Sequence, residues 1–202
     1  MRTIRPTSVI AFTFLTCAGL AGCSHNAAPQ EEQSAEVLTE SADDALVSTQ
    51  TLLPAQCGGI TRLHVLGDIY LGSQPKAEDF AQARKDGIRT VINLRHAAEL
   101  TDFNEQQVVE AEGLAYVNIP WSGANELTDA IFDSARAQFT SAPRPMLVHC
   151  ASANRVGAVW IPYRVLDAGV TWDAALVEAK TIGLKSPEFE AKALDYIQRH
   201  EK

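Results

Sequence analysis

Short apolar runs alternate with helix-like stretches from about residue 58 to residue 200. Val91, Ile92 and Leu94 lie in the strongest of these runs, which is typical of a strand buried on both faces of a parallel sheet. Gly67 and Asp68 form a turn signal between the first two runs. The pattern predicts strands at Leu63–Val65, Ile69–Leu71, Ile88–Leu94, Leu114–Ile119 and Met146–His149.

Helical periodicity fills the segments between and after these strands. A helix that opens at Pro75 is expected to bury Phe80 and Ala83 and to end at Gly87. Further helices are predicted at Thr101–Glu112, Asp129–Phe139, Arg155–Asp167, Thr171–Ile182 and Ser186–His200. This alternation predicts an α/β fold, a three-layer αβα domain with a mostly parallel central sheet.

The first 22 residues have the pattern of a secretory signal: a basic start, a short apolar run and small residues at the end. Residues 20–23, Leu-Ala-Gly-Cys, resemble the lipobox of bacterial lipoproteins. That resemblance implies cleavage before Cys23 and acylation of this cysteine. Because Ser24 rather than Asp follows, it also implies the outer membrane, with the protein facing the periplasm. A plain secretory signal remains the alternative.

Residues 23–57 are acidic and are predicted to form a flexible tether between the lipid and a domain at 58–202. Between Ser24 and Gln56 there is no Lys or Arg and no strong apolar periodicity. The whole chain carries a formal charge of −8, which argues against a nucleic-acid partner. Contact with the membrane is therefore expected only through the N-terminal lipid.

The segment from His149 to Arg155 has the pattern of an anion-binding loop. The last apolar strand delivers Cys150 to a run of small residues, Ala151, Ser152, Ala153 and Asn154, and a helix begins at Arg155. Loop N–H groups and the helix N-terminus together can bind an anion and stabilise a thiolate. Arg155 can also bind two oxygens of a tetrahedral oxyanion. The pattern predicts a nucleophilic Cys150, with a buried structural cysteine as the alternative.

His149 and Cys57 are the other two residues with a possible chemical role. His149 has no second His or Asp at ligand spacing, so no metal site is predicted. Cys57 is the second thiol of the folded part, and a disulfide between Cys57 and Cys150 is left open.

About residues 60–166 resemble the cysteine phosphatases of dual-specificity type, most closely the bacterial branch named after the beta-lactamase-hydrolase-like phosphatase domain. The resemblance rests on residues 70–75 (Tyr-Leu-Gly-Ser-Gln-Pro), 87–95 and 116–120 in addition to the loop. It implies that Cys150 accepts the phosphoryl group, that Arg155 binds the phosphate with residues 151–154, and that no cofactor is needed. A phosphorylated protein or a small phosphate ester would be the partner.

The chain departs from the family pattern at four points. Four residues, rather than five, separate Cys150 from Arg155, and Ala153 stands where the family has glycine. Val156 replaces the usual Ser or Thr, and no aspartate follows Pro120 directly, so that Glu126 and Asp129 become the candidate general acids. Two alternatives therefore stay open: a rhodanese-like sulfurtransferase with a Cys150 persulfide, and an inactive anion-binding module.

Overall fold

The computed structural model describes residues 51–201, which contain one mixed sheet of six strands. The order across the sheet is β1-β2-β3-β6-β4-β5. Strands β3, β6, β4 and β5 are parallel, whereas β2 and β1 add antiparallel at the β3 edge. The strands are β1 Leu53–Pro54, β2 Leu63–Leu66, β3 Ile69–Gly72, β4 Thr90–Asn93, β5 Ala115–Asn118 and β6 Met146–His149. The predicted, mostly parallel sheet is confirmed.

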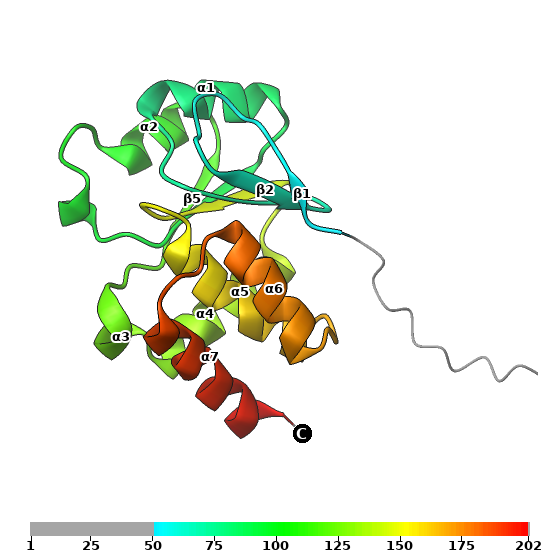
Figure 1. The fold of residues 1–202 in the computed structure, drawn as a ribbon. Coiled ribbons are helices and arrows are strands. Elements are labelled where there is room, and N and C mark those ends of the chain that lie inside the picture. Colours follow the sequence, from blue (N-terminus) through cyan, green and yellow to red (C-terminus); the bar gives the residue numbers. More distant parts are fainter. Residues whose placement is uncertain (1–50, 202) are drawn as a thin grey trace, which may run out of the picture. The chain divides into compact units, whose positions relative to one another are not determined.

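Helices cover both faces of this sheet and give the expected three-layer αβα arrangement (Figure 1). Helices α1 and α2 lie on one face, and α4, α5, α6 and α7 lie on the other. The helices are α1 Ala77–Lys85, α2 Glu105–Ala111, α3 Gly123–Glu126, α4 Asp129–Ser141, α5 Asn154–Leu166, α6 Trp172–Ile182 and α7 Pro187–His200, and a 3₁₀ turn spans Ala97–Glu99. None of these helices within residues 51–201 is long and apolar enough to cross a bilayer.

The two central strands supply side chains to both hydrophobic cores. Val91 and Leu147 pack in the core that contains residues of α1 and α2, whereas Ile92 and Val148 pack in the core that contains residues of α5. This division follows from the strand itself, because successive side chains point to opposite faces. All four residues of β4 and of β6 are buried, as expected for the middle of a parallel sheet.

The folded domain begins earlier than predicted. Leu53 in β1 pairs with Val65 in β2, so the sheet starts five residues before the expected boundary at 58. A two-residue strand is too short to produce an alternating pattern, so the pattern of apolar residues does not predict it. The predicted signal region and tether up to residue 50 lie outside the described residues.

The helix predicted from Thr101 is shorter in the structure. It begins at Glu105, because the side chain of Asn104 accepts a hydrogen bond of 3.1 Å from the backbone N–H of Gln107 and caps the helix there. Part of the preceding segment forms the 3₁₀ turn at 97–99 instead. These turns place the side chains between β4 and α2 at the edge of the sheet where the predicted loop lies.

Helix α5 approaches α6 closely at Gly157. A Cβ atom at this position would lie 2.8 Å from the carbonyl oxygen of Ala179 and 2.9 Å from Cβ of Leu184. Contacts this short require the neighbouring backbone to shift. Glycine at 157 therefore fixes the depth of α5 behind the loop at 150–153.

We expect Gly157→Ala to lower the free energy of unfolding by about 1–3 kcal/mol, the usual cost of overpacking. In an exposed helix the same change would stabilise the protein by about 1 kcal/mol. Urea denaturation measures the difference. Gly59→Ala is the control, because a Cβ there would lie 3.4 Å from Asp79, an ordinary contact. A stabilised Gly157→Ala protein would show that α5 and α6 are not in tight contact here.

Candidate active site

The loop at 150–153 joins the end of β6 to the start of α5 and lies at the carboxyl edge of the parallel strands. Strand β6 is central, with β3 and β4 on either side. Cys150 is only 1% exposed, and its thiol packs in the core that contains residues of α5. The structure thus places Cys150 at the predicted strand-to-helix junction, and α5 begins after three further residues, at Asn154.

Ala153 gives the loop its tight bend. Its φ angle is +67°, in the left-handed region that glycine adopts readily and other residues seldom adopt. For an L-residue this conformation costs roughly 1–2 kcal/mol. The methyl group is fully buried, so the surrounding packing holds the strained residue in place. The loop therefore has a glycine-like backbone at the position where the family pattern has glycine.

The side chain of Asn154 has a structural role. Its Oδ1 atom accepts hydrogen bonds from the backbone N–H groups of Lys185, at 2.7 Å, and Ser186, at 3.3 Å. These bonds tie the start of α5 to the connection between α6 and α7. The side-chain oxygen is thus structural, and the contribution of Asn154 to an anion site is limited to its backbone.

Arg155 is buried and held by four hydrogen bonds. Its Nη1 atom donates to the carboxylate of Glu99 at 2.7 Å and to the carbonyls of Trp121 at 2.7 Å and Leu94 at 3.2 Å. Its Nη2 atom donates to the second oxygen of Glu99 at 2.6 Å. The guanidinium is therefore fixed in one orientation before any ligand arrives.

Charge pairing sets the ionisation of both partners. The hydrogen bond from Arg155 is the main reason why the pKa of Glu99 falls to about 2, although burial acts in the opposite direction. Burial alone would lower the pKa of Arg155, but Glu99 and the nearby Cys150 outweigh it and raise that pKa. Both partners of the ion pair are therefore charged at neutral pH.

Gln74 and Arg95 extend this ion pair around the loop. Arg95 lies 3.4 Å from Glu99 through Nε and donates from Nη1 to Oε1 of Gln74 at 2.6 Å. Gln74 in turn donates from Nε2 to Glu105 at 2.6 Å, and its backbone N–H donates to the carbonyl of Ala151 at 3.4 Å. Arg95 both forms this salt bridge and lines a cavity of about 510 Å³ together with Gln74 and Glu99.

Neither predicted general acid is free. The carboxylate of Asp129 is bound by Arg199 at 2.5 and 2.8 Å, and this contact lowers its pKa. Glu126 accepts hydrogen bonds from His96 at 2.6 Å and from the backbone of Ser122 at 2.7 Å, which lower its pKa. A carboxyl group with a lowered pKa is deprotonated at neutral pH, so neither is set up to donate a proton by itself.

Cys57 and Cys150 are both free and buried, and they belong to different cores. Cys57 packs in the core that contains residues of α1, whereas Cys150 packs in the core that contains residues of α5. The disulfide that the sequence left open is thus absent here. Burial, assisted by Asp86, raises the pKa of Cys57 to about 12, so this thiol is a poor nucleophile.

The sequence analysis missed three functional candidates, Glu99, Glu105 and His96. His96 and Glu99 lie in the segment that follows β4, a strand that borders β6, and Glu105 is the first residue of α2 at the end of that segment. That position was a usable signal, because ligand sites in such sheets form at this edge. The partners of these residues lie up to 56 positions away, and spacing along the chain does not reveal them.

Comparison with known proteins supports the fold. The "Beta-lactamase hydrolase-like protein" of Xylella fastidiosa (strain 9a5c) is 24% identical over 135 residues, which are 65% of this chain and 30% of that protein. The chain thus spans less than a third of that relative's length. P. aeruginosa TpbA has a TM-score of 0.59 at 22% identity and covers 76% of this chain and 92% of its own. A TpbA variant has also been solved in complex with pTyr, with a TM-score of 0.57 at 20% identity, covering 75% of this chain and 90% of its own.

The family model described as "Beta-lactamase hydrolase-like protein, phosphatase-like domain" matches residues 61–166, just over half of the chain. The matched range runs from the segment before β2 to the end of α5. It therefore includes Gln74, Glu99, Glu105, Cys150 and Arg155, the residues of the loop and of the polar network around it. The chain belongs to the family of beta-lactamase hydrolase-like phosphatase domains.

Proposed function

We propose that this protein is a cysteine-dependent phosphatase that hydrolyses phosphoric monoesters through a phosphocysteine intermediate. The observation that carries the proposal is the placement of Cys150 at the end of β6, with the guanidinium of Arg155 fixed beside it at the start of α5. Family membership and the pTyr complex of the related TpbA variant point to the same chemistry. A phosphorylated protein or a small phosphate ester is the proposed substrate.

The proposed reaction has two steps. The thiolate of Cys150 attacks phosphorus, the ester P–O bond breaks, and the leaving oxygen takes up a proton. Water then attacks the phosphorus of the intermediate, the S–P bond breaks, and inorganic phosphate leaves. Backbone N–H groups of the loop and the charge of Arg155 would stabilise the oxygens as negative charge shifts onto them.

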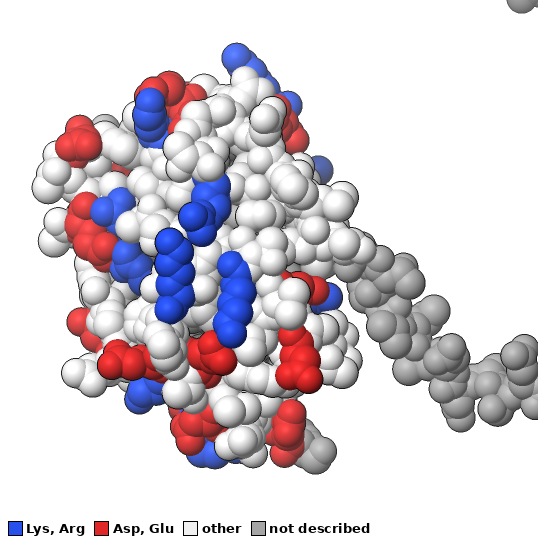
Figure 2. All heavy atoms as spheres, viewed as in Figure 1, with Lys and Arg blue, Asp and Glu red and all other residues white. Residues whose placement is uncertain are grey.

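Local charge favours an anionic substrate despite the negative net charge of the chain. Lys and Arg side chains gather in the middle of the face on which α5 begins, with acidic side chains mainly around them (Figure 2). Arg62 lies near the loop at 150–153. A Cβ atom added to Gly183 would lie 3.1 Å from Nη1 of Arg62 and also 3.1 Å from the carbonyl oxygen of Ser152, so these two atoms are close to each other. A local positive potential of this kind concentrates anions at the mouth of a site.

We assign the proton of the leaving group to the His96–Glu126 pair instead of a single carboxylate. Only the protonated ring of His96 can act as the acid: both of its nitrogens then carry hydrogen, Nε2 donates to Glu126, and Nδ1 would give its proton to the leaving oxygen and leave a neutral ring. The backbone N–H of His96 also bonds the Glu99 oxygen that Arg155 binds, at 2.9 Å, which places His96 next to the guanidinium. Asp129 is not retained, because Arg199 occupies it.

We also propose that residues 1–22 are a lipoprotein signal and that Cys23 anchors the mature protein to the outer membrane. The support is the sequence pattern, with the Leu-Ala-Gly-Cys segment at its end. Several acyl chains on one residue would hold the protein firmly, since each buried CH₂ contributes ~0.8 kcal/mol. The domain would then act on substrates within reach of a tether in the periplasm.

The first prediction concerns the nucleophile and its arginine, measured as phosphate release from p-nitrophenyl phosphate and from a phosphotyrosine peptide. Cys150→Ser should abolish turnover. Arg155→Lys should lower it roughly ten- to a hundredfold, because a hydrogen bond to a charged group contributes ~1.5–3 kcal/mol and ~1.4 kcal/mol corresponds to a decade. Since Arg155 is tied to Glu99, this variant should also melt earlier than the wild type.

Arg136→Lys is the matched control, because Arg136 also binds a carboxylate with two nitrogens, on Asp167, but away from the loop. It should lose stability and keep turnover. Thiocyanate formation from thiosulfate and cyanide without phosphatase activity would instead establish a sulfurtransferase. Phosphate binding without either reaction would establish an inactive anion-binding module.

The second prediction separates the proton donor from the rest of the site. His96→Ala should slow the hydrolysis of a phosphotyrosine peptide by about tenfold or more, within the range of a positioned general acid. Hydrolysis of p-nitrophenyl phosphate should change little, because nitrophenolate leaves without a proton. Asp129→Asn serves as the control and should affect neither substrate. Equal losses with both substrates would show that His96 supports the site without donating the proton.

The third prediction tests the anchor. Cys23→Ala should give a soluble or unprocessed protein, because the atom that would be acylated is gone. Fractionation of cells into membrane and soluble material, followed by mass determination, measures both outcomes. A processed Cys23→Ala protein that still fractionates with membranes would rule out lipidation at this residue.

A further inference from the structure

Arg62 lies beside the loop at 150–153, at the carboxyl edge of the sheet. A Cβ atom on Gly183 would meet both Nη1 of Arg62 and the carbonyl oxygen of Ser152 at 3.1 Å, so these two atoms cannot lie further apart than twice this distance. Gly183 has no side chain that could separate them. Ala151 and Ser152 are exposed, so the guanidinium flanks the part of the loop that a ligand can reach.

Backbone hydrogen bonds hold residue 62 in this place. The antiparallel pairing of β2 with β3 brings the start of β2 next to the end of β3. There the carbonyl of Arg62 accepts a hydrogen bond of 2.8 Å from the backbone N–H of Ser73, and its own N–H donates to Oγ of Ser73 at 3.3 Å. The next residue, Gln74, donates from its backbone N–H to the carbonyl of Ala151 at 3.4 Å. Arg62 is therefore attached to the loop through Ser73 and Gln74.

The charge of Arg62 has no counter-ion among residues 51–201. Six other arginines in this range form an ion pair with a carboxylate, and Arg62 is not one of them: Arg95, Arg136, Arg144, Arg155, Arg164 and Arg199. After burial, the positive charge of Arg62 is the second cause that lowers the pKa of the nearby His64. An unpaired guanidinium at the edge of a site attracts negatively charged ligands.

Lys185 is a second cation close to the same loop. Its backbone N–H donates to Oδ1 of Asn154 at 2.7 Å, which fixes it next to the first residue of α5. Lys185 is exposed, and the lysines that form ion pairs in the described part of the chain are Lys76 and Lys180. Figure 2 shows Lys and Arg side chains gathered on the face where α5 begins. Two unpaired cations, from different elements, therefore flank the loop.

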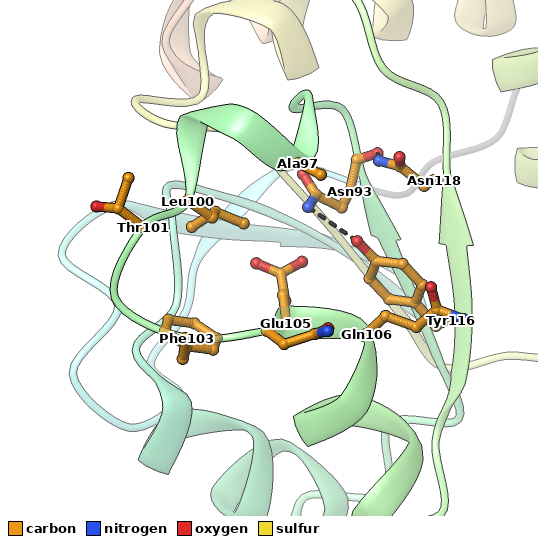
Figure 3. A pocket seen from close by; sticks show the side chains of 10 residues that line it. Asn93, Ala97, Leu100, Thr101, Phe103, Glu105, Gln106, Tyr116 and Asn118 are labelled. Atoms are coloured by element: carbon orange, nitrogen blue, oxygen red, sulfur yellow. Dashed lines mark hydrogen bonds between the residues drawn. The ribbon is translucent and has the colours of Figure 1, made fainter.

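Two cavities at the same edge of the sheet are less suited to a second anion. The first, of about 480 Å³, has no Lys, Arg or His among its lining residues, and the carboxylate of Glu105 points toward the Asn93–Tyr116 hydrogen bond there (Figure 3). The second, of about 510 Å³, contains Arg95 and one lysine, but three carboxylates line it as well. A second negative group next to the loop is therefore favoured on the side of Arg62.

We infer that Arg62 and Lys185 form a second anion subsite beside the loop, and that preferred substrates carry another negatively charged group close to the scissile phosphate. The inference rests on the proposed function and narrows its substrate class. Arg62 would bind two oxygens of a carboxylate or of a second phosphate, and Lys185 would add a point charge. Lys185 lies beyond residues 61–166, so the family match does not supply this subsite.

The experiment compares three phosphotyrosine peptides of equal length on the full-length protein. In the first, glutamines flank the phosphotyrosine; in the second, glutamates do; the third is the first with a phosphothreonine two positions away. Steady-state hydrolysis gives kcat and KM for each. The wild type should have a KM about tenfold lower for a peptide with the second anion, the effect of one hydrogen bond to a charged group. The second and third peptides distinguish a carboxylate from a phosphate as the bound group.

Variants then locate the subsite. Arg62→Gln should remove most of the difference in KM and leave kcat and the neutral peptide unchanged, whereas Arg62→Lys should restore part of it. Lys185→Gln should reduce the difference as well, and its exposed position makes it informative even if Arg62→Gln fails to fold. Arg84→Gln is the matched control, because Arg84 is exposed in the last turn of α1, which leads to the opposite edge of the sheet. It should keep the full difference.

Three results would overturn the inference: equal KM values for the three peptides in the wild type, a full difference in both Arg62→Gln and Lys185→Gln, or the same loss in Arg84→Gln. Calorimetric binding of the peptides to Cys150→Ser separates it from the proposed function. Tighter binding of the doubly anionic peptides without hydrolysis by the wild type would keep the subsite and reject the phosphatase. Hydrolysis of all three with equal KM would keep the phosphatase and reject the subsite.

Discussion

The ion pair between the buried Arg155 and the partly exposed Glu99 fixes the shape of the candidate site. Arg155 lies in the first turn of α5 and Glu99 ends the short turn after β4, so their two hydrogen bonds join segments that are far apart in the chain. A guanidinium at this depth is stable only when its hydrogen-bonding groups are satisfied. Glu99 and two carbonyls satisfy Nη1 and Nη2 here. The position of the loop at 150–153 therefore depends on a contact between two residues that lie outside it.

The parallel sheet explains why so many distant residues meet at one edge. Gln74 follows β3, Arg95 follows β4, Trp121 follows β5 and Cys150 follows β6. These four strands run in the same direction, so the residues that follow them emerge on the same side. The order of the strands puts β6 in the middle, and its neighbours supply the side chains that surround the nucleophile.

Much of this arrangement could be predicted from the sequence. The strands near Val91 and Leu147 were predictable because an apolar run between helical stretches has few other interpretations. Cys150 and Arg155 were predictable because they flank a run of small residues after such a strand. Asp129 was misjudged as an acid, since its partner Arg199 lies 70 positions away and no local pattern reveals it. Glu99 and Glu105 were missed for the same reason: an acidic residue in a polar segment resembles surface until its partner is located.

Charge balance then links the network to the chemistry. The network contains two guanidinium groups, Arg95 and Arg155, and both contact the carboxylate of Glu99. Glu105 joins the same network through the neutral amide of Gln74, which Arg95 also binds. Attack on a phosphate ester would move negative charge from sulfur to oxygens above the loop, where the charge of Arg155 can stabilise it. Glu99 therefore holds in place the cation that this step needs.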